Sequence, residues 1–304
     1  MRKREASRIF WSAVAAVLWL SLATVARAAT TETLRIISCA PNGTQMLYAL
    51  GLGDQVIGVS EYCQFPPEAQ NKPKYGNLFE PNLEAMLAAR PSAVVATPTN
   101  HKVIEFFQRR SGTQVVVLES CDTIAEIHAT IQALGDALGR EVQARALVEA
   151  DRAALAEMAA ANAPGEERPR VLFVVGRDRG SLRNLYAAGS GTYIAELIEA
   201  AGGTNAAGPD DGLWPTYSRE GLIGLRPGII VEIADADTTE TRQELRRAWS
   251  RLPMLPAVRD SRLELLTDRR VLIPGPYLAR DAEALRGVIG RRGADSETPP
   301  SLGE

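Results

Sequence analysis

The chain has 304 residues, 45% of them hydrophobic and 23% charged, which is enough for two modest α/β lobes or one large one. Its formal net charge is −3, and no basic block follows the N-terminal segment, so nucleic-acid binding is disfavoured. The spacing of Cys39, Cys63 and Cys121 fits no zinc pattern, although a disulfide between Cys39 and Cys63 is one option in an oxidising compartment.

Residues 1–28 have the pattern of a signal peptide. Four basic residues precede an apolar core over residues 9–25, and Ala26-Arg27-Ala28 is an A-x-A cleavage pattern. The alternative is an uncleaved membrane anchor, because the 17-residue core is slightly long for a signal and slightly short for a span. We expect cleavage, a periplasmic location and no lipid anchor, since no cysteine follows the core. Removing this segment would leave a net charge of −7.

The first half of the chain predicts strands that alternate with helices. Strands are expected at 34–38, 56–59, 93–96 and 115–118, and helices from Pro41 to Gly51 and over 102–110. Such alternation is typical of a mainly parallel sheet with covered faces. Residues 123–162 then have a helical composition that is interrupted near Gly135 and Gly139. We therefore predict an N-terminal lobe at 30–138 and a linking helix at 139–163.

The alternation restarts after Ala163-Pro164-Gly165. Strands are expected at 171–175, 229–233, 263–266 and 271–273, and helices at 193–201 and 279–289. This gives a C-terminal lobe at 169–290 and a flexible polar tail at 291–304. The predicted fold is α/β, with two Rossmann-like lobes joined by one long backbone helix and a ligand cleft between them. A single rigid helix predicts only small closure around a ligand.

One ten-residue pattern occurs twice, at 82–91 and at 218–227. Each copy has a capping side chain, a glutamate two residues later (Glu84, Glu220) and an Arg-Pro stop before an apolar strand. The helix dipole alone would favour a carboxylate in the first turn of each helix. Equivalent positions in two lobes instead favour a pair of docking points for a partner with matching basic groups.

Catalytic patterns are missing from the sequence. The two histidines, His101 and His128, are too few for a bare metal site, and no nucleophile motif is present. We expect His128 to be a surface or packing residue of its helix. Gly189-Ser190-Gly191-Thr192 could hold an anion before a helix, but it is more typical of a loop and cap.

Ligands of open α/β sheets bind at the carboxyl ends of the strands. The loops expected at those ends carry aromatic and polar side chains: Tyr62, Phe65, Leu78, Phe79, Thr97 and Asn100 in the first half, and Arg177, Arg179, Tyr186, Trp214, Tyr217 and Tyr277 in the second. The aromatic residues suit a large, flat or amphipathic ligand, or they seal the lobes. Arg177 and Arg179 would favour an anionic ligand, or they are solvated surface.

In this order and spacing, a set of short motifs resembles the periplasmic substrate-binding proteins of ABC importers for ferric siderophores, haem and cobalamin, the class with a helical backbone between its lobes. The resemblance covers about residues 34 to 290. Its motifs are Arg35–Ser38 with Pro41, Val56–Val59, Tyr62 with Pro66-Pro67, Asn82-Leu83-Glu84, Ala201–Asn205, and Trp214-Pro215 before Ser218-Arg219-Glu220.

The resemblance implies a non-enzymatic, monomeric receptor without a cofactor, which delivers a metal chelate to an ABC permease dimer with its ATPase. It places Glu84 and Glu220 on arginines of the permease. The cobalamin-binding members are the most similar, and they imply that Tyr62, Tyr186 and Trp214 hold the ligand. Phe79, Asn100, Arg177 and Tyr217 complete the predicted ligand set.

Three departures leave the ligand open. Leu78 and Thr97 stand where cobalamin-binding members carry tryptophan, and Tyr277 interrupts the usual Pro-Gly-Pro-Arg stretch. A corrinoid and a ferric siderophore are therefore both candidates, with haem third. An extracytoplasmic α/β enzyme that uses His101 and a sensor subunit of the same fold are the alternatives from other functional classes.

Overall fold

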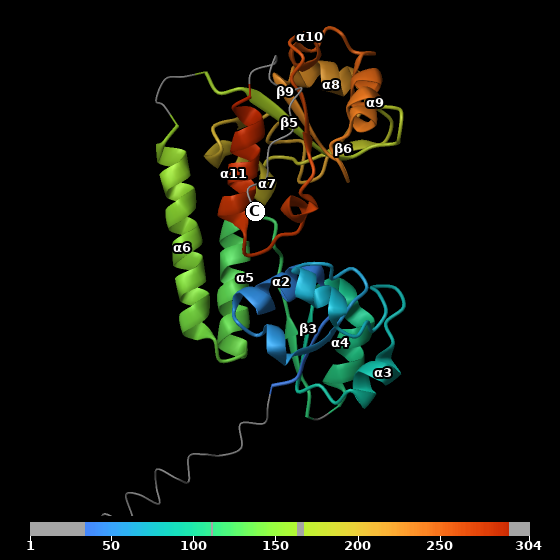
Figure 1. The fold of residues 1–304 in the computed structure, drawn as a ribbon, viewed down its shortest axis with the longest axis vertical. Helices are drawn as coiled ribbons and strands as arrows, with labels where there is room; N and C mark the ends of the chain where they lie inside the picture. Colours follow the sequence, from blue (N-terminus) through green and yellow to red (C-terminus); the bar gives the residue numbers. More distant parts are fainter. Residues whose placement is uncertain (1–33, 111, 163–166, 292–304) are drawn as a thin grey trace, which may run out of the picture.

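The structure is a computed structural model that describes residues 34–110, 112–162 and 167–291. The expectations for the signal segment at 1–28, for the stop at 163–165 and for the tail beyond residue 291 lie outside these residues. Within the described chain, no helix is long and apolar enough to cross a membrane. Two α/β lobes lie one above the other, with α6 beside both (Figure 1).

The N-terminal lobe is built on a four-stranded parallel sheet with the order β2-β1-β3-β4. Its strands are β1 (Ile36–Ser38), β2 (Val56–Val59), β3 (Ala93–Ala96) and β4 (Gln114–Val117). Its helices are α2 (Pro41–Ala49), α3 (Leu83–Ala88) and α4 (His101–Gln108), with 3-10 turns η1 (Gly53–Gln55), η2 (Pro67–Asn71) and η3 (Pro98–Asn100). Every residue of β3 is buried, as expected for a central parallel strand.

The C-terminal lobe has a mixed six-stranded sheet in which β10, β9, β5 and β7 pair in parallel, and β6 pairs antiparallel with both β5 and β8. The strands are β5 (Arg170–Gly176), β6 (Leu185–Ala187), β7 (Thr204–Asn205), β8 (Thr216–Tyr217), β9 (Ile229–Ile233) and β10 (Leu263–Leu266). The helices are α7 (Tyr193–Ala200), α8 (Arg219–Leu225), α9 (Thr239–Trp249), α10 (Pro256–Arg259) and α11 (Leu278–Ile289), with the 3-10 turn η4 (Arg269–Leu272).

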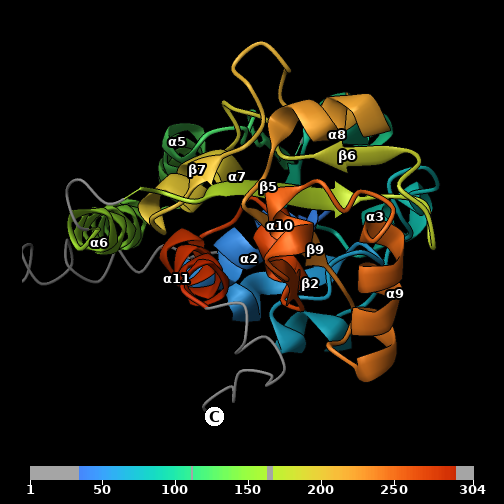
Figure 2. The same cartoon turned by 90° about the horizontal axis from the view of Figure 1, so that it is seen from above.

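Side-chain alternation along the strands divides the core into layers. Along β5, Val171 and Phe173 join a large cluster with α7 and α11, whereas Leu172 and Val174 pack with α9 on the other face. Seen from above, α6 and α11 lie near one another at one edge of the molecule, and α9 lies at the opposite edge (Figure 2).

The chain crosses between the lobes through a helical hairpin, α5 (Ile124–Ala137) and α6 (Glu141–Ala160). The turn between them contains Gly139, whose φ of 68° is in the left-handed region that glycine favours. The predicted interruption at Gly135 is wrong, because Gly135 lies inside α5. A Cβ on Gly135 would come within 2.4 Å of the Ala144 Cβ, so glycine at this position allows α5 and α6 to pack closely.

The largest hydrophobic cluster runs through both lobes, and each lobe also has a smaller cluster of its own. The largest cluster runs from Ile36 of β1 through α5, α6 and α7 to Ile289 of α11. A buried polar tie fixes three of these helices, because Asp151 of α6 accepts hydrogen bonds from His128 Nε2 (2.6 Å) and from the Ala279 backbone N–H of α11 (2.9 Å). His128 is therefore a packing residue, which was one of the two expectations for it.

The C-terminal lobe differs from the sequence prediction in two places. Residues 271–273 are not a strand: they belong mainly to η4, which begins where the Asp268 side chain accepts a hydrogen bond from the Arg270 N–H. Helix α9 was not expected. Its sequence is mostly polar, and burial of Leu245, Ala248 and Trp249 stabilises it through tertiary packing.

Candidate ligand cleft and docking surface

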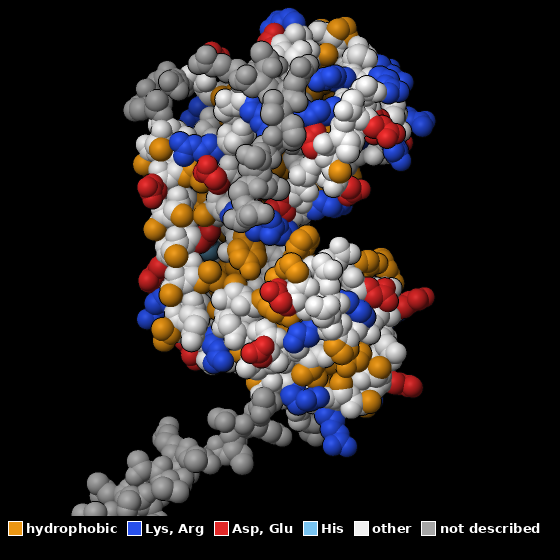
Figure 3. Space-filling view, in the orientation of Figure 1, with side chains coloured by type: hydrophobic (Ala, Val, Ile, Leu, Met, Phe, Trp, Pro, Cys, Tyr) orange, Lys and Arg blue, Asp and Glu red, His pale blue; other side chains and the backbone are white. Residues whose placement is uncertain are grey.

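A hollow separates the two lobes on the side away from α6 (Figure 3). Contacts beside this hollow also join the lobes. The Arg270 guanidinium of η4 lies 5.5 Å from the centre of the Phe65 ring in the N-terminal lobe. Gly275 approaches Gln45 of α2 so closely that a Cβ would lie 2.8 Å from the Gln45 amide oxygen. These contacts and the shared core hold the two lobes, which form the walls of the hollow, at a set separation.

Exposed aromatic side chains occur in both lobes, three on loops and one on strand β6. Tyr62 and Phe79 are exposed in the N-terminal lobe, and Tyr186 and Trp214 are exposed in the C-terminal lobe. Tyr186 is positioned by its strand partner Gly176, since a Cβ there would lie 2.7 Å from the tyrosine ring. These four predicted ligand residues are available to a bound molecule, and none of them belongs to the buried core.

The other predicted ligand residues are occupied by contacts within the protein. Asn100 is buried, and its side-chain oxygen accepts hydrogen bonds from the Thr97 backbone N–H and hydroxyl. The Tyr217 hydroxyl donates to Asp211 Oδ2 (2.8 Å). Burial and this carboxylate raise the pKa of Tyr217 well above its usual range. Asn100 therefore shapes the start of α4, and Tyr217 fixes the loop before β8.

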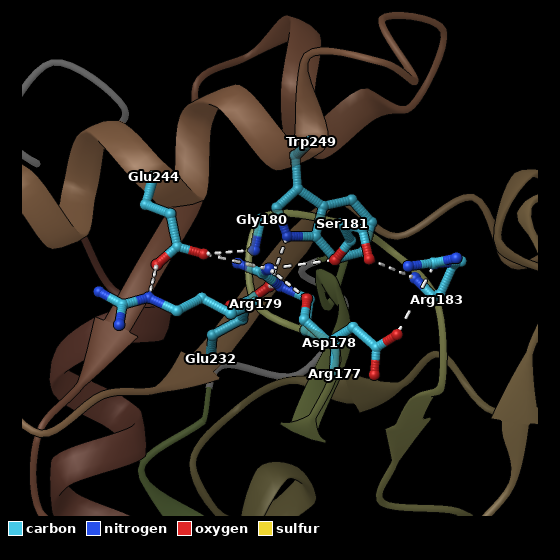
Figure 4. A network of polar contacts seen from close by, with 9 residues as sticks. All are labelled: Arg177, Asp178, Arg179, Gly180, Ser181, Arg183, Glu232, Glu244 and Trp249. Atoms are coloured by element: carbon cyan, nitrogen blue, oxygen red, sulfur yellow. Dashed lines mark hydrogen bonds and ion pairs between the residues drawn. The ribbon is translucent and has the colours of Figure 1, made fainter.

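Arg177 lies in a buried network rather than at an open surface (Figure 4). Its side chain is 7% exposed, and its Nε donates to Glu232 Oε1 (2.8 Å), which also accepts from Trp249 Nε1 (2.6 Å). Burial lowers the pKa of the guanidinium, but the hydrogen bond and charge of Glu232, helped by Glu244, outweigh it and raise that pKa. This position departs from the expectation that Arg177 lines the cleft.

The same network shapes the loop between β5 and β6. Arg177 Nη1 donates to the Ser181 carbonyl (3.1 Å), and Glu244 of α9 accepts from the Gly180 N–H (3.0 Å). That backbone hydrogen bond is the main cause that lowers the pKa of Glu244. The loop is thereby held in one conformation, and it presents the exposed side chains of Arg179 and Arg183 to solvent.

Two other sequence features have local structural roles. The Thr192 hydroxyl accepts the Ala195 N–H (3.2 Å) and caps α7, as the loop-and-cap interpretation of this segment expects. Cys39, Cys63 and Cys121 are all free thiols, so the optional Cys39–Cys63 disulfide is not formed. Among the residues that the structure describes, no three His, Cys, Asp or Glu side chains form a group that could hold a metal ion.

The two repeat helices are built in the same way. Asn82 caps α3 and Ser218 caps α8 through side-chain hydrogen bonds of 3.0 and 3.2 Å to the backbone. Each helix is followed by an arginine in the left-handed region, Arg90 with φ 49° and Arg226 with φ 47°. Glu84 and Glu220 are both exposed. The pKa of Glu220 is lowered by hydrogen bonds that its carboxylate accepts from the Glu220 backbone N–H and from the Ser218 side chain.

An arginine at the base of the first strand of each lobe fixes the end of the corresponding helix. Arg35 Nη2 donates to the Ala89 carbonyl (2.7 Å), and Arg170 Nη2 donates to the Leu225 carbonyl (3.1 Å). Ala89 and Leu225 are equivalent positions of the repeat. The sequence repeat is therefore also a structural repeat, and sequence reasoning missed the two arginines because each bond spans more than 50 residues.

The family model described as "Periplasmic binding protein" matches residues 36–269. The chain belongs to the periplasmic binding protein family. The resemblance inferred from the motifs is thereby confirmed, and membership of this family indicates an extracytoplasmic location.

Two relatives and one solved structure illustrate the likeness of this periplasmic binding protein. It is 26% identical over 263 residues to an uncharacterised ABC transporter substrate-binding lipoprotein of Bacillus subtilis, covering 85% of this chain and 80% of the relative. It is 25% identical over 245 residues to the vitamin B12-binding protein of Pectobacterium carotovorum, covering 80% and 86%. The periplasmic haem-binding protein of Vibrio cholerae has the same fold, with a TM-score of 0.74, 21% identity and coverage of 86% and 100%.

Proposed function

We propose that this periplasmic binding protein is the monomeric receptor of an ABC importer, and that it captures a metal chelate between its lobes without catalysing a reaction. In this proposal residues 1–28 direct export to the periplasm. The observation that carries the proposal is the pair of equivalently built helices, each with an exposed glutamate, on two lobes that share one core. Such a pair suits a permease dimer that offers a basic group twice.

The proposed ligand is a corrinoid. Exposed aromatic side chains on both lobes suit a large ligand that is mostly apolar on its faces. A relative that is 25% identical over most of both chains is a vitamin B12-binding protein, which supports the same choice. The burial of Arg177 removes one of the two arginines that would favour an anionic chelate.

A ferric siderophore is the second candidate, because Arg179 is exposed and the network below it holds its loop in place. A guanidinium presented in this way can bind the carboxylate or catecholate oxygens of an anionic chelate. The two ligands predict different effects of mutation. A corrinoid depends on the aromatic side chains, whereas an anionic chelate depends on Arg179.

Ligand retention tests the choice directly. The purified protein should keep a visible absorption band after it is mixed with cyanocobalamin and desalted, and ferric catecholate, ferric hydroxamate and haemin serve as the competing probes. Trp214→Ala and Tyr62→Ala should weaken corrinoid binding, whereas Val142→Ala, at an exposed site on α6, should not. Retention of an anionic chelate that is lost in Arg179→Gln would favour the second candidate, and retention of none of the probes would refute a chelate ligand.

Docking is tested separately with the cognate permease–ATPase complex, held in lipid nanodiscs. Glu84→Ala with Glu220→Ala should leave ligand binding unchanged and lower the association rate at low salt. Glu141→Ala is the matched control, since Glu141 is also exposed and lies in the first turn of a helix, α6. Unchanged association in the double variant would refute the docking role of the two glutamates.

A further inference from the structure

Each repeat helix exposes one large aliphatic side chain, and the two side chains occupy equivalent positions. Leu87 of α3 is 41% exposed and Ile223 of α8 is 40% exposed. The preceding residues, Met86 and Leu222, are buried in separate cores of the two lobes. Each helix is therefore firmly packed through one face, and the aliphatic side chain is exposed because it lies on the other face.

The exposed aliphatic residue shares a helix face with the glutamate. Residues three and four apart lie side by side on a helix surface, so each face carries a carboxylate, an aliphatic side chain three residues later and a small residue after that. The two sets are Glu84, Leu87 and Ala88 on α3, and Glu220, Ile223 and Gly224 on α8. A Cβ at Gly224 would meet no atom within 4 Å, so nothing of this protein covers that end of the face.

A single exposed leucine is ordinary on a protein surface and carries no meaning by itself. The repetition is what distinguishes these two side chains. Between positions 82–92 and 218–228, the burial class agrees at ten of eleven equivalent positions, and Leu83 and Arg219 are the one pair that differs. Two lobes with separate local cores thus present the same combination of charge and apolar surface.

We propose that Leu87 and Ile223 are the apolar anchors of the docking surface, each inserting into a recess beside a basic group of the permease dimer. The inference deepens the proposed function and rests on it. An exposed ion pair contributes little to affinity because solvent screens it, whereas a side chain that becomes fully desolvated can dominate an interface. Glu84 and Glu220 therefore orient the complex, and the aliphatic side chains determine how long it lasts.

The charge of the surface selects this occupant over a second copy of the chain. Two copies that met through these faces would place carboxylates against carboxylates, which opposes association. A partner with a single recess would use only one of the two equivalent faces. A dimer that presents the same recess and the same cation twice uses both.

Binding kinetics to the permease–ATPase complex in nanodiscs separate the two contributions. Leu87→Ser with Ile223→Ser should weaken binding about ten- to fiftyfold, because about 40% of each side chain is still available for burial. The loss should lie in faster dissociation, with an unchanged association rate and salt dependence. Glu84→Ala with Glu220→Ala should instead slow association and flatten its salt dependence.

Three controls complete the experiment. Val142→Ser changes an exposed aliphatic residue of α6 and should leave binding unchanged. Leu87→Met with Ile223→Met keeps an apolar side chain of similar volume and should retain most of the affinity. The melting temperature and ligand binding of every variant should match those of the wild type.

The outcomes distinguish this inference from the proposed function. If the glutamate variant loses binding and the serine variant keeps wild-type dissociation, the anchors are wrong and the docking surface stands. If neither variant changes binding, the docking function itself is wrong. A serine variant that loses ligand affinity or melts early would show that the two side chains serve the cleft or the fold, which also overturns the inference.

Discussion

Arg177→Met is the substitution that best separates a structural role from a ligand-binding one. The guanidinium pairs with Glu232, whose side chain is 10% exposed, and hydrogen-bonds the carbonyls of Asp178 and Ser181. Methionine fills a similar volume without the charge. The variant therefore leaves the Glu232 carboxylate buried without its counterion, while the Trp249 Nε1–H still donates to it.

Removing one partner of a buried ion pair costs about 3–5 kcal/mol, because the remaining charge has no counterion. The lower end, about 3 kcal/mol, applies here because the Trp249 indole still donates to Glu232 and because Glu244, at 32% exposure, stays hydrated. For a chain of this size each kcal/mol lowers the melting temperature by about 2–4 °C, so a fall of about 6–12 °C is expected.

Thermal and chemical unfolding measure the loss, with two companion variants as controls. Arg183→Met removes an arginine of the same loop that is 80% exposed, and it should change the free energy of unfolding by less than about 0.5 kcal/mol. Arg177→Met with Glu232→Gln should recover at least half of the loss, since glutamine is neutral and still accepts from Trp249. If Arg177→Met has a normal melting temperature but binds the ligand more weakly, the structural role of the buried network is refuted. Arg177 would then be a ligand-binding residue of the cleft.

Three other predictions concern ionisable groups. Burial raises the pKa of Asp281 from 3.8 to about 6, against the opposing charge of Arg280. Its contribution to stability is therefore full below pH 4 and lost as the pH rises through 6, and the stability difference between the wild type and Asp281→Asn should fall by about 3 kcal/mol across that window. Asp151→Ala leaves the His128 and Ala279 N–H groups unpaired and should cost about 2–4 kcal/mol in chemical unfolding; a cost below 1 kcal/mol would contradict the three-helix tie. Burial, with Cys63 nearby, raises the pKa of Cys39 to about 12, so alkylation at pH 8 should be slow until the chain unfolds, and a Cys39–Cys63 disulfide in the secreted protein would contradict the free thiol.

Much of the fold could be predicted because many of its strands are short apolar runs that can be recognised from the local sequence alone. The apolar runs at 56–59, 93–96, 229–233 and 263–266 are strands at those bounds, since a short apolar run between turn residues fits a buried parallel strand. The same rule, applied to the apolar run at 271–273, predicted a strand that the structure does not have. Three apolar residues carry too little information to exclude a 3-10 turn, and Asp268 caps that turn from outside the run.

The site was harder to predict because its decisive contacts are not local. Arg177 follows a strand and is followed by charged residues, so sequence alone places it on a surface loop. Glu232, its buried partner, lies 55 residues away on β9. The two repeat helices, α3 and α8, show the opposite case, since their caps, glutamates and stops fall within ten residues and occur twice. Local chemistry could be recognised there, and only the long-range Arg35 and Arg170 bonds were missed.

The shared core explains why the sequence predicts the family more readily than the ligand. The helices α5, α6, α7 and α11 join both lobes in one hydrophobic cluster, and Asp151 ties three helices within it. Large opening would expose that cluster, so the walls of the cleft are set before the ligand arrives. Trp214 and Tyr186, which we propose contact the ligand, belong to none of the buried clusters. Under that proposal, substitution at these exposed positions changes the ligand while the core and the two repeat helices stay the same.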